Sequence, residues 1–191
     1  MDALSSFEFF RRGIVEQPVV SSDHIQPFHD AGVDPLWVYH CCAQGRLVPN
    51  RFFAMPSARN RIMGVLLYLY HLKGLLQWGY NFYYMQFSRS LADPFAMTHC
   101  DYAFPSGDAY LVYPGPGGEP LSSLRAEVQS EGLTDLRALN TLESLIGREA
   151  VHSLVLNLAR MDTMTFTQYP TSASFLLSLR EAVFDAIEQA L

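Results

Sequence analysis

The sequence predicts an α/β fold with about three short parallel strands and a helical C-terminal tail. Apolar, strand-like runs occupy 36–42 and 75–79, and an amphipathic helical pattern lies between them at about 56–73. Strands that are separated by helices usually pair in parallel through right-handed crossovers. From 121 onward, apolar residues recur every three or four positions, which indicates helices. We therefore expect a single unit over 1–191.

Two short helices are expected before the first predicted strand. Ser5 or Ser6 is placed to cap a helix that runs through about Gly13. Pro18 and the VVSSD segment after it break this helix. A second short helix follows at about 24–30, where Ala31-Gly32 closes it.

The strand at 36–42 alternates between two faces. Leu36, Val38 and His40 share one face, and Trp37, Tyr39 and Cys41 share the other. The helix that begins near Pro56 ends at Gly74, and the strand at 75–79 is expected to be buried. The segment 81–108 reads as a long irregular connection, and loops of that length inside a compact domain are usually functional. A third strand is expected at 110–113, before the PGPGGEP turn.

The tail is expected to contain three amphipathic helices: one that ends at Gly147, one at 148–159 and one at 172–191. Acidic residues follow one another at i,i+4 spacing in the first of them, at Glu131 and Asp135. Such like-charged pairs are unfavourable, so Arg125 and Arg137 are expected to compensate them.

Composition excludes several classes of function. The net charge is −6 and the chain has a single lysine, Lys73, so a basic nucleic-acid footprint is absent. Its three cysteines lack metal-ligand spacing and a disulfide framework, so we expect no metal, no cofactor and a reducing compartment. We see neither a signal-peptide leader nor an apolar run of spanning length, so we expect a cytoplasmic protein without a membrane partner.

Several segments, taken in order, resemble the C-terminal part of the glycoside hydrolase family 123 catalytic domain, also catalogued as domain of unknown function 4091. They are DHIQPF, LWVYHCC, NRFFAMPSARNR, QWGYNFY, SGDAYLVYPG and SLRAEVQSEGLTDLRAL. The resemblance runs from Met1 to about Gly147. It implies a (β/α)₈ barrel and retaining hydrolysis of β-N-acetylgalactosaminides. In that mechanism the 2-acetamido group of the substrate is the nucleophile, an Asp orients it, and the adjacent Glu protonates the leaving oxygen.

The acidic pair of that mechanism cannot be placed on this chain, because no two acidic residues are adjacent anywhere in it. No catalytic residue is therefore assigned. The resemblance suggests that the chain begins inside the barrel and holds its last three or four strand-helix units. On this interpretation 1–120 form a partial barrel and 121–191 the C-terminal helices.

Candidate substrate-binding residues cluster where the predicted strands end, which is where α/β folds bind ligands. Trp78 is expected to stack on a sugar ring, with Tyr80 and Asn81 beside it; packing in the core is the alternative. Tyr39 and His40 end the earlier strand, and a lone His there is more often structural. Asn50 and Arg51 are further candidates, which could equally hold their loop in place. Asp108 is expected to hold a loop first and to contact the ligand second.

Two functions remain open on the sequence. The first is a C-terminal portion of a glycosidase-like barrel that binds an N-acetylhexosamine glycoside but is inactive alone. Its further partner would be the missing half of the barrel or a second copy of the chain. The alternative is a non-enzymatic helical interaction module, whose aromatic residues belong to core and interface.

Overall fold

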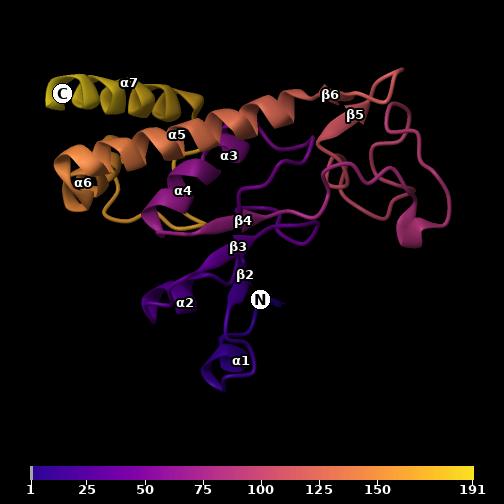
Figure 1. Cartoon of the computed structure of the whole chain (residues 1–191), viewed down its shortest axis with the longest axis horizontal. Helices are drawn as coiled ribbons and strands as arrows, with labels where there is room; N and C mark the ends of the chain where they lie inside the picture. The colour runs from indigo at the N-terminus through magenta and orange to yellow at the C-terminus, as the bar shows by residue number, and fades with distance from the viewer. Residues whose placement is uncertain (1) are drawn as a thin grey trace.

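A four-stranded parallel sheet lies at the centre of the molecule, in a computed structural model that describes residues 2–191. The strands follow the chain order across the sheet (Figure 1). They are β1 (Asp2–Leu4), β2 (Pro18–Ser21), β3 (Trp37–Tyr39) and β4 (Gly74–Leu76). Helices α1 (Phe7–Arg11) and α2 (Gln26–Asp30) connect the first three strands. The predicted α/β class is therefore confirmed.

The sheet differs from the prediction in how many strands it has and in which segments form them. It has four parallel strands where about three were expected: β2 was not predicted, β1 was indicated only by the resemblance of MDALS to a barrel strand, and the third predicted strand lies outside this sheet. The segment expected to break a helix at Pro18 is β2, and all four of its residues are buried. Serines are typical of loops, yet Ser21 at the end of β2 and Ser22 directly after it are both buried. The strand predicted as buried at 75–79 is β4, where Leu76 is 41% exposed.

The third predicted strand is present but does not join the parallel sheet. It is β5 (Val112–Pro114), and it pairs antiparallel with β6 (Pro120–Ser122). The glycine-rich turn between them reverses the chain, since the Gly115 amide donates to the Glu119 carbonyl at 2.7 Å. A parallel partner would need a crossover, which this turn is too short to supply.

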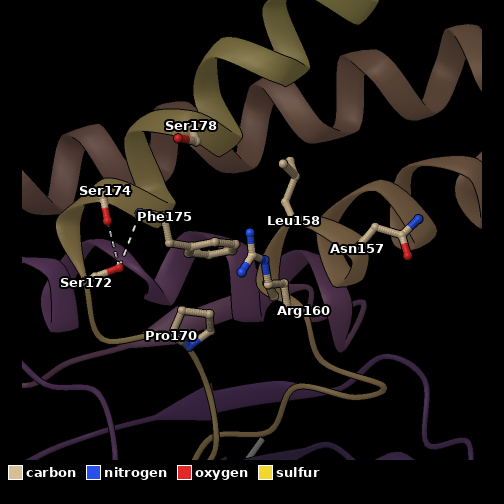
Figure 2. Close-up of a pocket in the computed structure, with 9 residues that line it drawn as sticks. Asn157, Leu158, Arg160, Pro170, Ser172, Ser174, Phe175 and Ser178 are labelled. Atoms are coloured by element: carbon tan, nitrogen blue, oxygen red, sulfur yellow. Dashed lines mark hydrogen bonds between the residues drawn. The ribbon is translucent and has the colours of Figure 1, made fainter.

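Helices dominate the rest of the chain. The predicted helix at 56–73 forms as two successive pieces, α3 (Ser57–Arg61) and α4 (Met63–Leu69). The tail contains α5 (Leu124–Ile146), α6 (Arg148–Ala159) and α7 (Ala173–Ala190), as expected. The Ser172 hydroxyl caps α7 by accepting from the Phe175 amide at 3.4 Å (Figure 2). Within residues 2–191, no helix combines the length and apolar character needed to cross a bilayer.

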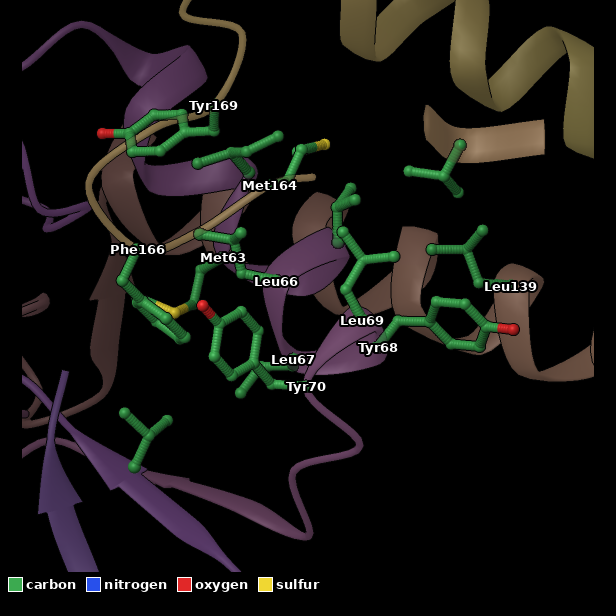
Figure 3. Close-up of a cluster of buried hydrophobic side chains, with 14 of the residues drawn as sticks. Met63, Leu66, Leu67, Tyr68, Leu69, Tyr70, Leu139, Met164, Phe166 and Tyr169 are labelled. Atoms are coloured by element: carbon green, nitrogen blue, oxygen red, sulfur yellow. The ribbon is translucent and has the colours of Figure 1, made fainter. Parts of the chain in front are cut away.

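Helix α4 forms the centre of the core, and every one of its residues is buried. It belongs to one hydrophobic cluster with Val20 and Val38 of the sheet and with residues of α5 such as Leu139. Figure 3 shows Tyr68 directed toward Leu139, while Tyr70 lies beside Phe166. Because α4 is buried on all sides, its position in the core is fixed. The position where β4 begins is fixed with it, since β4 follows α4 in the chain.

Charge compensation on α5 comes from other helices and not from its own arginines. Asp135, 6% exposed, accepts from Arg61 of α3 at 2.7 Å and from Arg180 of α7 at 2.6 Å. Arg180 also pairs with Glu131. The prediction that Arg125 and Arg137 compensate these acids is wrong, because facing helices supply closer guanidinium groups.

Candidate functional site

The chain segments that follow β3 and β4 meet a third segment that ends the long irregular connection. This connection contains one short 3₁₀ turn, η1 (Gln86–Ser88), and extends to one side of the sheet (Figure 1). At their meeting point lies Asp108, whose side chain is fully buried. Gln77 Nε2 donates to Asp108 Oδ1 at 3.0 Å, and Trp78 Nε1 donates to Asp108 Oδ2 at 3.0 Å. Both carboxylate oxygens are therefore engaged by residues just beyond β4.

Arg51 ties the loop after β3 into the same network. Its Nη2 donates to Gln77 Oε1 at 2.5 Å, to the Asp108 carbonyl at 3.3 Å and to the Gly79 carbonyl. A Cβ at Gly79 would collide with the Asp108 carbonyl, so only glycine permits this close approach. Three segments that are distant in sequence are thus held together by one arginine and one carboxylate.

The Trp78 ring lies at the outer edge of this network, and it is 37% exposed. Phe82 and Phe104 pack against it with ring centroids 5.3 and 4.7 Å away, at interplanar angles of 63° and 53°. Tyr80 next to it is 54% exposed, and the Asn81 side chain is also exposed. A fixed indole with neighbouring exposed polar groups is what a sugar-stacking site requires.

Burial is the main cause of the shifted pKa values of the charged groups beneath the Trp78 ring. Burial raises the pKa of Asp108, and the hydrogen bond from Trp78 and the charge of Arg51 partly oppose this rise. Burial and the nearby Arg125 lower the pKa of Arg51 to about 10, so it stays cationic at neutral pH. Arg125 of α5 donates to the Gly107 carbonyl at 2.5 Å and lies over the Phe53 ring at 4.6 Å. It thereby anchors the segment that carries Asp108.

The loop after β3 is held mainly by Asn50. Its Nδ2 donates to the carbonyls of Cys41 at 2.9 Å and Gln44 at 2.7 Å, and its Oδ1 accepts from the Arg51 amide at 2.8 Å. Gln44 in turn donates to Ser21 Oγ of β2 at 2.9 Å. These bonds fix the direction from which Arg51 enters the network.

His40 is enclosed behind this loop, 2% exposed, and its ring nitrogens have no hydrogen-bond partner in the described chain. Burial and the charge of Arg51 lower the pKa of His40 to about 3, so the ring is neutral at physiological pH. Tyr39 lies on the opposite face of β3 and is half-buried. The predicted alternation of faces along 36–42 is confirmed.

The structure brings three of the eight predicted residues, Arg51, Trp78 and Asp108, into one hydrogen-bonded network. Tyr80 and Asn81 adjoin it through the chain. Four of the eight are enclosed by protein groups: His40, Asn50, Arg51 and Asp108. Substrate contact by any of the eight remains a prediction, and the open candidates are Trp78, Tyr80, Asn81 and the half-buried Tyr39.

Sequence reasoning missed the residues that support the Trp78 ring. Phe82 and Phe104 contact the Trp78 ring, and Gln77 donates to Asp108. Arg125 holds the segment that carries Asp108, through the Gly107 carbonyl. Gln77 offered a usable signal, since a polar residue directly after an apolar strand marks a strand end. Phe104 offered none, because it is 26 positions from Trp78 in an irregular segment.

Two features outside this network bear on chemistry. In the part of the chain that the structure describes, no group of three or more His, Cys, Asp or Glu residues could hold a metal ion. An open groove of about 620 Å³ lies between α6 and α7, and Arg160 points into it (Figure 2). It lies on the far side of the molecule from the long irregular connection (Figure 1).

Comparison with protein families gives a match over most of the chain. The sequence model of a family described as glycoside hydrolase 123, catalytic domain, matches residues 1–142, which is well over half of the chain. No curated protein matches the sequence.

Proposed function

Because the chain belongs to the glycoside hydrolase 123 catalytic-domain family, we propose that it binds an N-acetylhexosamine glycoside at the Trp78 ring. Membership confirms the resemblance that the sequence motifs indicated. In this proposal the chain is the C-terminal portion of a glycosidase-like barrel. Residues 1–120 supply part of the barrel, and 121–191 supply the helices that cover it.

A single observation carries the proposal: the partly exposed Trp78 ring is held at the end of β4. Its N–H is fixed by Asp108 at 3.0 Å, and two aromatic neighbours support it. The apolar faces of sugar rings stack on such indoles, and a few placed polar groups orient them. Tyr80 and Asn81 would supply those groups, and Tyr39 would do so from the end of β3.

The buried members of the predicted set have supporting roles in this proposal. Asn50 and Arg51 hold the loop after β3, and Asp108 holds the indole. His40 fills the space beneath that loop as a neutral ring. None of these roles requires contact with the sugar.

The architecture supports a partial barrel. The sheet has four parallel strands, and a (β/α)₈ barrel has eight. Within the described chain, β1 and β4 are the outer strands, each paired on one side. The sequence has no adjacent acidic pair, so we propose that the chain contributes to binding and does not hydrolyse glycosides alone.

Fluorescence titration tests the proposed function. The chain has two tryptophans, Trp37 and Trp78, so a Trp37→Phe variant isolates the signal of Trp78. Titration with a β-N-acetylgalactosaminide should change the Trp78 emission saturably, whereas an equal concentration of glucose should leave it unchanged. An emission that responds to neither sugar would refute binding at this ring.

One observation favours the alternative, an interaction module. Leu124 and Leu177 are 73% and 61% exposed on the helical side of the molecule. Near Leu177, an apolar hollow of about 170 Å³ lies between α3, α5 and α7. Sedimentation of a Leu177 variant, together with the sugar titration, distinguishes the two functions. On the interaction hypothesis, a Leu177→Ser change alters the association state, and sugar binding is absent.

A further inference from the structure

The carboxylate of Asp108 has an arrangement that goes beyond holding a loop. It is fully buried, yet both of its oxygens accept hydrogen bonds from consecutive residues, Gln77 and Trp78. In a strand, consecutive side chains point to opposite faces. Beyond β4, however, the two side chains reach the same carboxylate. The chain there is therefore bent around Asp108.

Gln77, one of the two donors to this carboxylate, is itself held in one orientation. Gln77 uses its Nε2 to donate to Asp108 Oδ1 at 3.0 Å, and its Oε1 accepts from Arg51 at 2.5 Å. The amide can therefore not turn over without losing both bonds. A chain of contacts leads from Arg51 through Gln77 and Asp108 to the indole N–H of Trp78.

From this arrangement we propose that Asp108 is a positioning residue, whose ionised carboxylate sets the orientation of the Trp78 ring. The inference rests on the proposed function, in which that ring is the sugar-stacking surface. Phe82 and Phe104 restrict the ring by packing, but they do not determine which edge of the indole points inward. The N–H bond to a buried charge does, because hydrogen bonds to an ionised acceptor are shorter and roughly twice as strong as neutral ones.

The inference has a consequence for pH. Protonation of Asp108 turns an acceptor-only carboxylate into a group with one donor, which conflicts with the donors of Gln77 and Trp78. Around the carboxylate lie the guanidinium groups of Arg51 and Arg125 and the thiols of Cys42 and Cys100. Both arginines stay charged and both thiols stay neutral at acidic pH, since burial raises the pKa of each thiol. His40 lies behind Arg51, and its pKa is about 3.

The indole N–H signals in a ¹H–¹⁵N correlation spectrum report this bond directly. Two such signals are expected, from Trp37 and Trp78, and a Trp37→Phe variant assigns them. On lowering the pH, the Trp78 signal should shift along one titration curve with a midpoint above 3.8, the ordinary carboxyl value, because the pKa of Asp108 is raised. The Trp37 signal should stay constant over the same range.

Two matched variants complete the test. Asp108→Asn should remove the titration of the Trp78 signal and weaken sugar affinity roughly tenfold. Asp101→Asn makes the same charge change at an exposed residue of the same segment, and it should leave both unchanged.

A Trp78 signal that ignores pH in the unmodified protein, or that titrates unchanged in Asp108→Asn, would overturn the inference. The titration of the unmodified protein decides the matter even if Asp108→Asn does not fold. No sugar is present in the spectroscopic experiment, so a protein that titrates as expected but binds no sugar refutes the proposed function and keeps the positioning role.

Discussion

Gly64 of α4 and Gly132 of α5 face each other at the point where the two helices cross. A Cβ on Gly64 would collide with the Gly132 carbonyl, and a Cβ on Gly132 would lie 2.6 Å from the carbonyl of Arg61, the last residue of α3, which precedes α4 directly. The two backbones therefore approach more closely than any side chain allows. This crossing seats α5 on the buried helix α4, and the N-terminal end of α5 in turn anchors Gly107 through Arg125.

Replacing Gly132 by Ala should therefore destabilise the protein. In an isolated helix, alanine is more favourable than glycine by about 1 kcal/mol. Overpacking at a close crossing should outweigh this gain and lower the free energy of unfolding by about 1–3 kcal/mol. Urea denaturation measures the change. Gly45→Ala is the control, since its Cβ would meet Phe52 at an ordinary 3.9 Å and should change stability by less than about 0.5 kcal/mol. A Gly132→Ala protein as stable as the original would contradict the close crossing.

Asp135 should contribute far more stability than Glu131, although Arg180 contacts both. The Asp135 side chain is 6% accessible and pairs with two arginines, whereas the Glu131 side chain is 51% accessible. Asp135→Asn leaves the largely enclosed Arg61 without a counter-charge and Arg180 with only the exposed Glu131, which should cost about 3 kcal/mol. Glu131→Gln removes an exposed pair and should cost less than about 1 kcal/mol. Thermal melts of the two variants should differ accordingly, and equal melting temperatures would argue against a buried ion network.

His40 should make the protein sensitive to acid. Its pKa is about 3 in the folded chain, against an ordinary value of 6.5 for a histidine that is exposed to water. Between these values the unfolded chain binds more protons than the folded one, so stability rises with pH through this window and is lost as the pH falls. The loss is at most about 1.4 kcal/mol for each pH unit.

A His40→Leu variant tests this sensitivity, because it should flatten the stability profile between pH 6.5 and 3. The control is His71→Asn, at an exposed residue whose φ of 53° asparagine tolerates. It should keep the acid-dependent loss. If His40→Leu unfolds in acid with the same profile as the original protein, His40 is not the responsible group.

Trp78→Ala should weaken sugar affinity more than it weakens the fold. Removing a core tryptophan costs about 3–5 kcal/mol. At this partly exposed site the main loss is one donor to Asp108, worth about 1–3 kcal/mol. Melting temperature and sugar affinity should be measured on the same preparations. A large drop in melting temperature, with unchanged affinity of the folded fraction, would assign Trp78 to the core.

The chain alone should not release a chromogenic aglycone from a β-N-acetylgalactosaminide. General acid catalysis typically contributes about 10²- to 10⁴-fold, and no adjacent acidic pair exists here to supply it by the mechanism of the resemblance. Absorbance assays over several hours measure the release. Turnover at a rate typical of enzymes would show that other residues perform the chemistry.

Local patterns were enough to predict the helical tail and the two faces of β3. The bounds of α6 follow directly from the glycine before it and from its apolar repeat. Val38 and His40 are buried as alternation requires, and the long irregular segment was evident from its prolines and aromatics. Each of these features depends on residues that are close together in the chain.

The tertiary structure alone decided which segments pair and which side chains meet. β1 and β2 carry Asp2, Pro18 and Ser21, which are typical of loops and caps, so their own residues did not indicate strands before a sheet was in place. Asp135 takes its partners from α3 and α7, and Asp108 takes Trp78 from thirty positions upstream. Such contacts depend on how helices and strands pack against one another. The apolar periodicity of each segment determines its own buried face, but not the segment that will cover it.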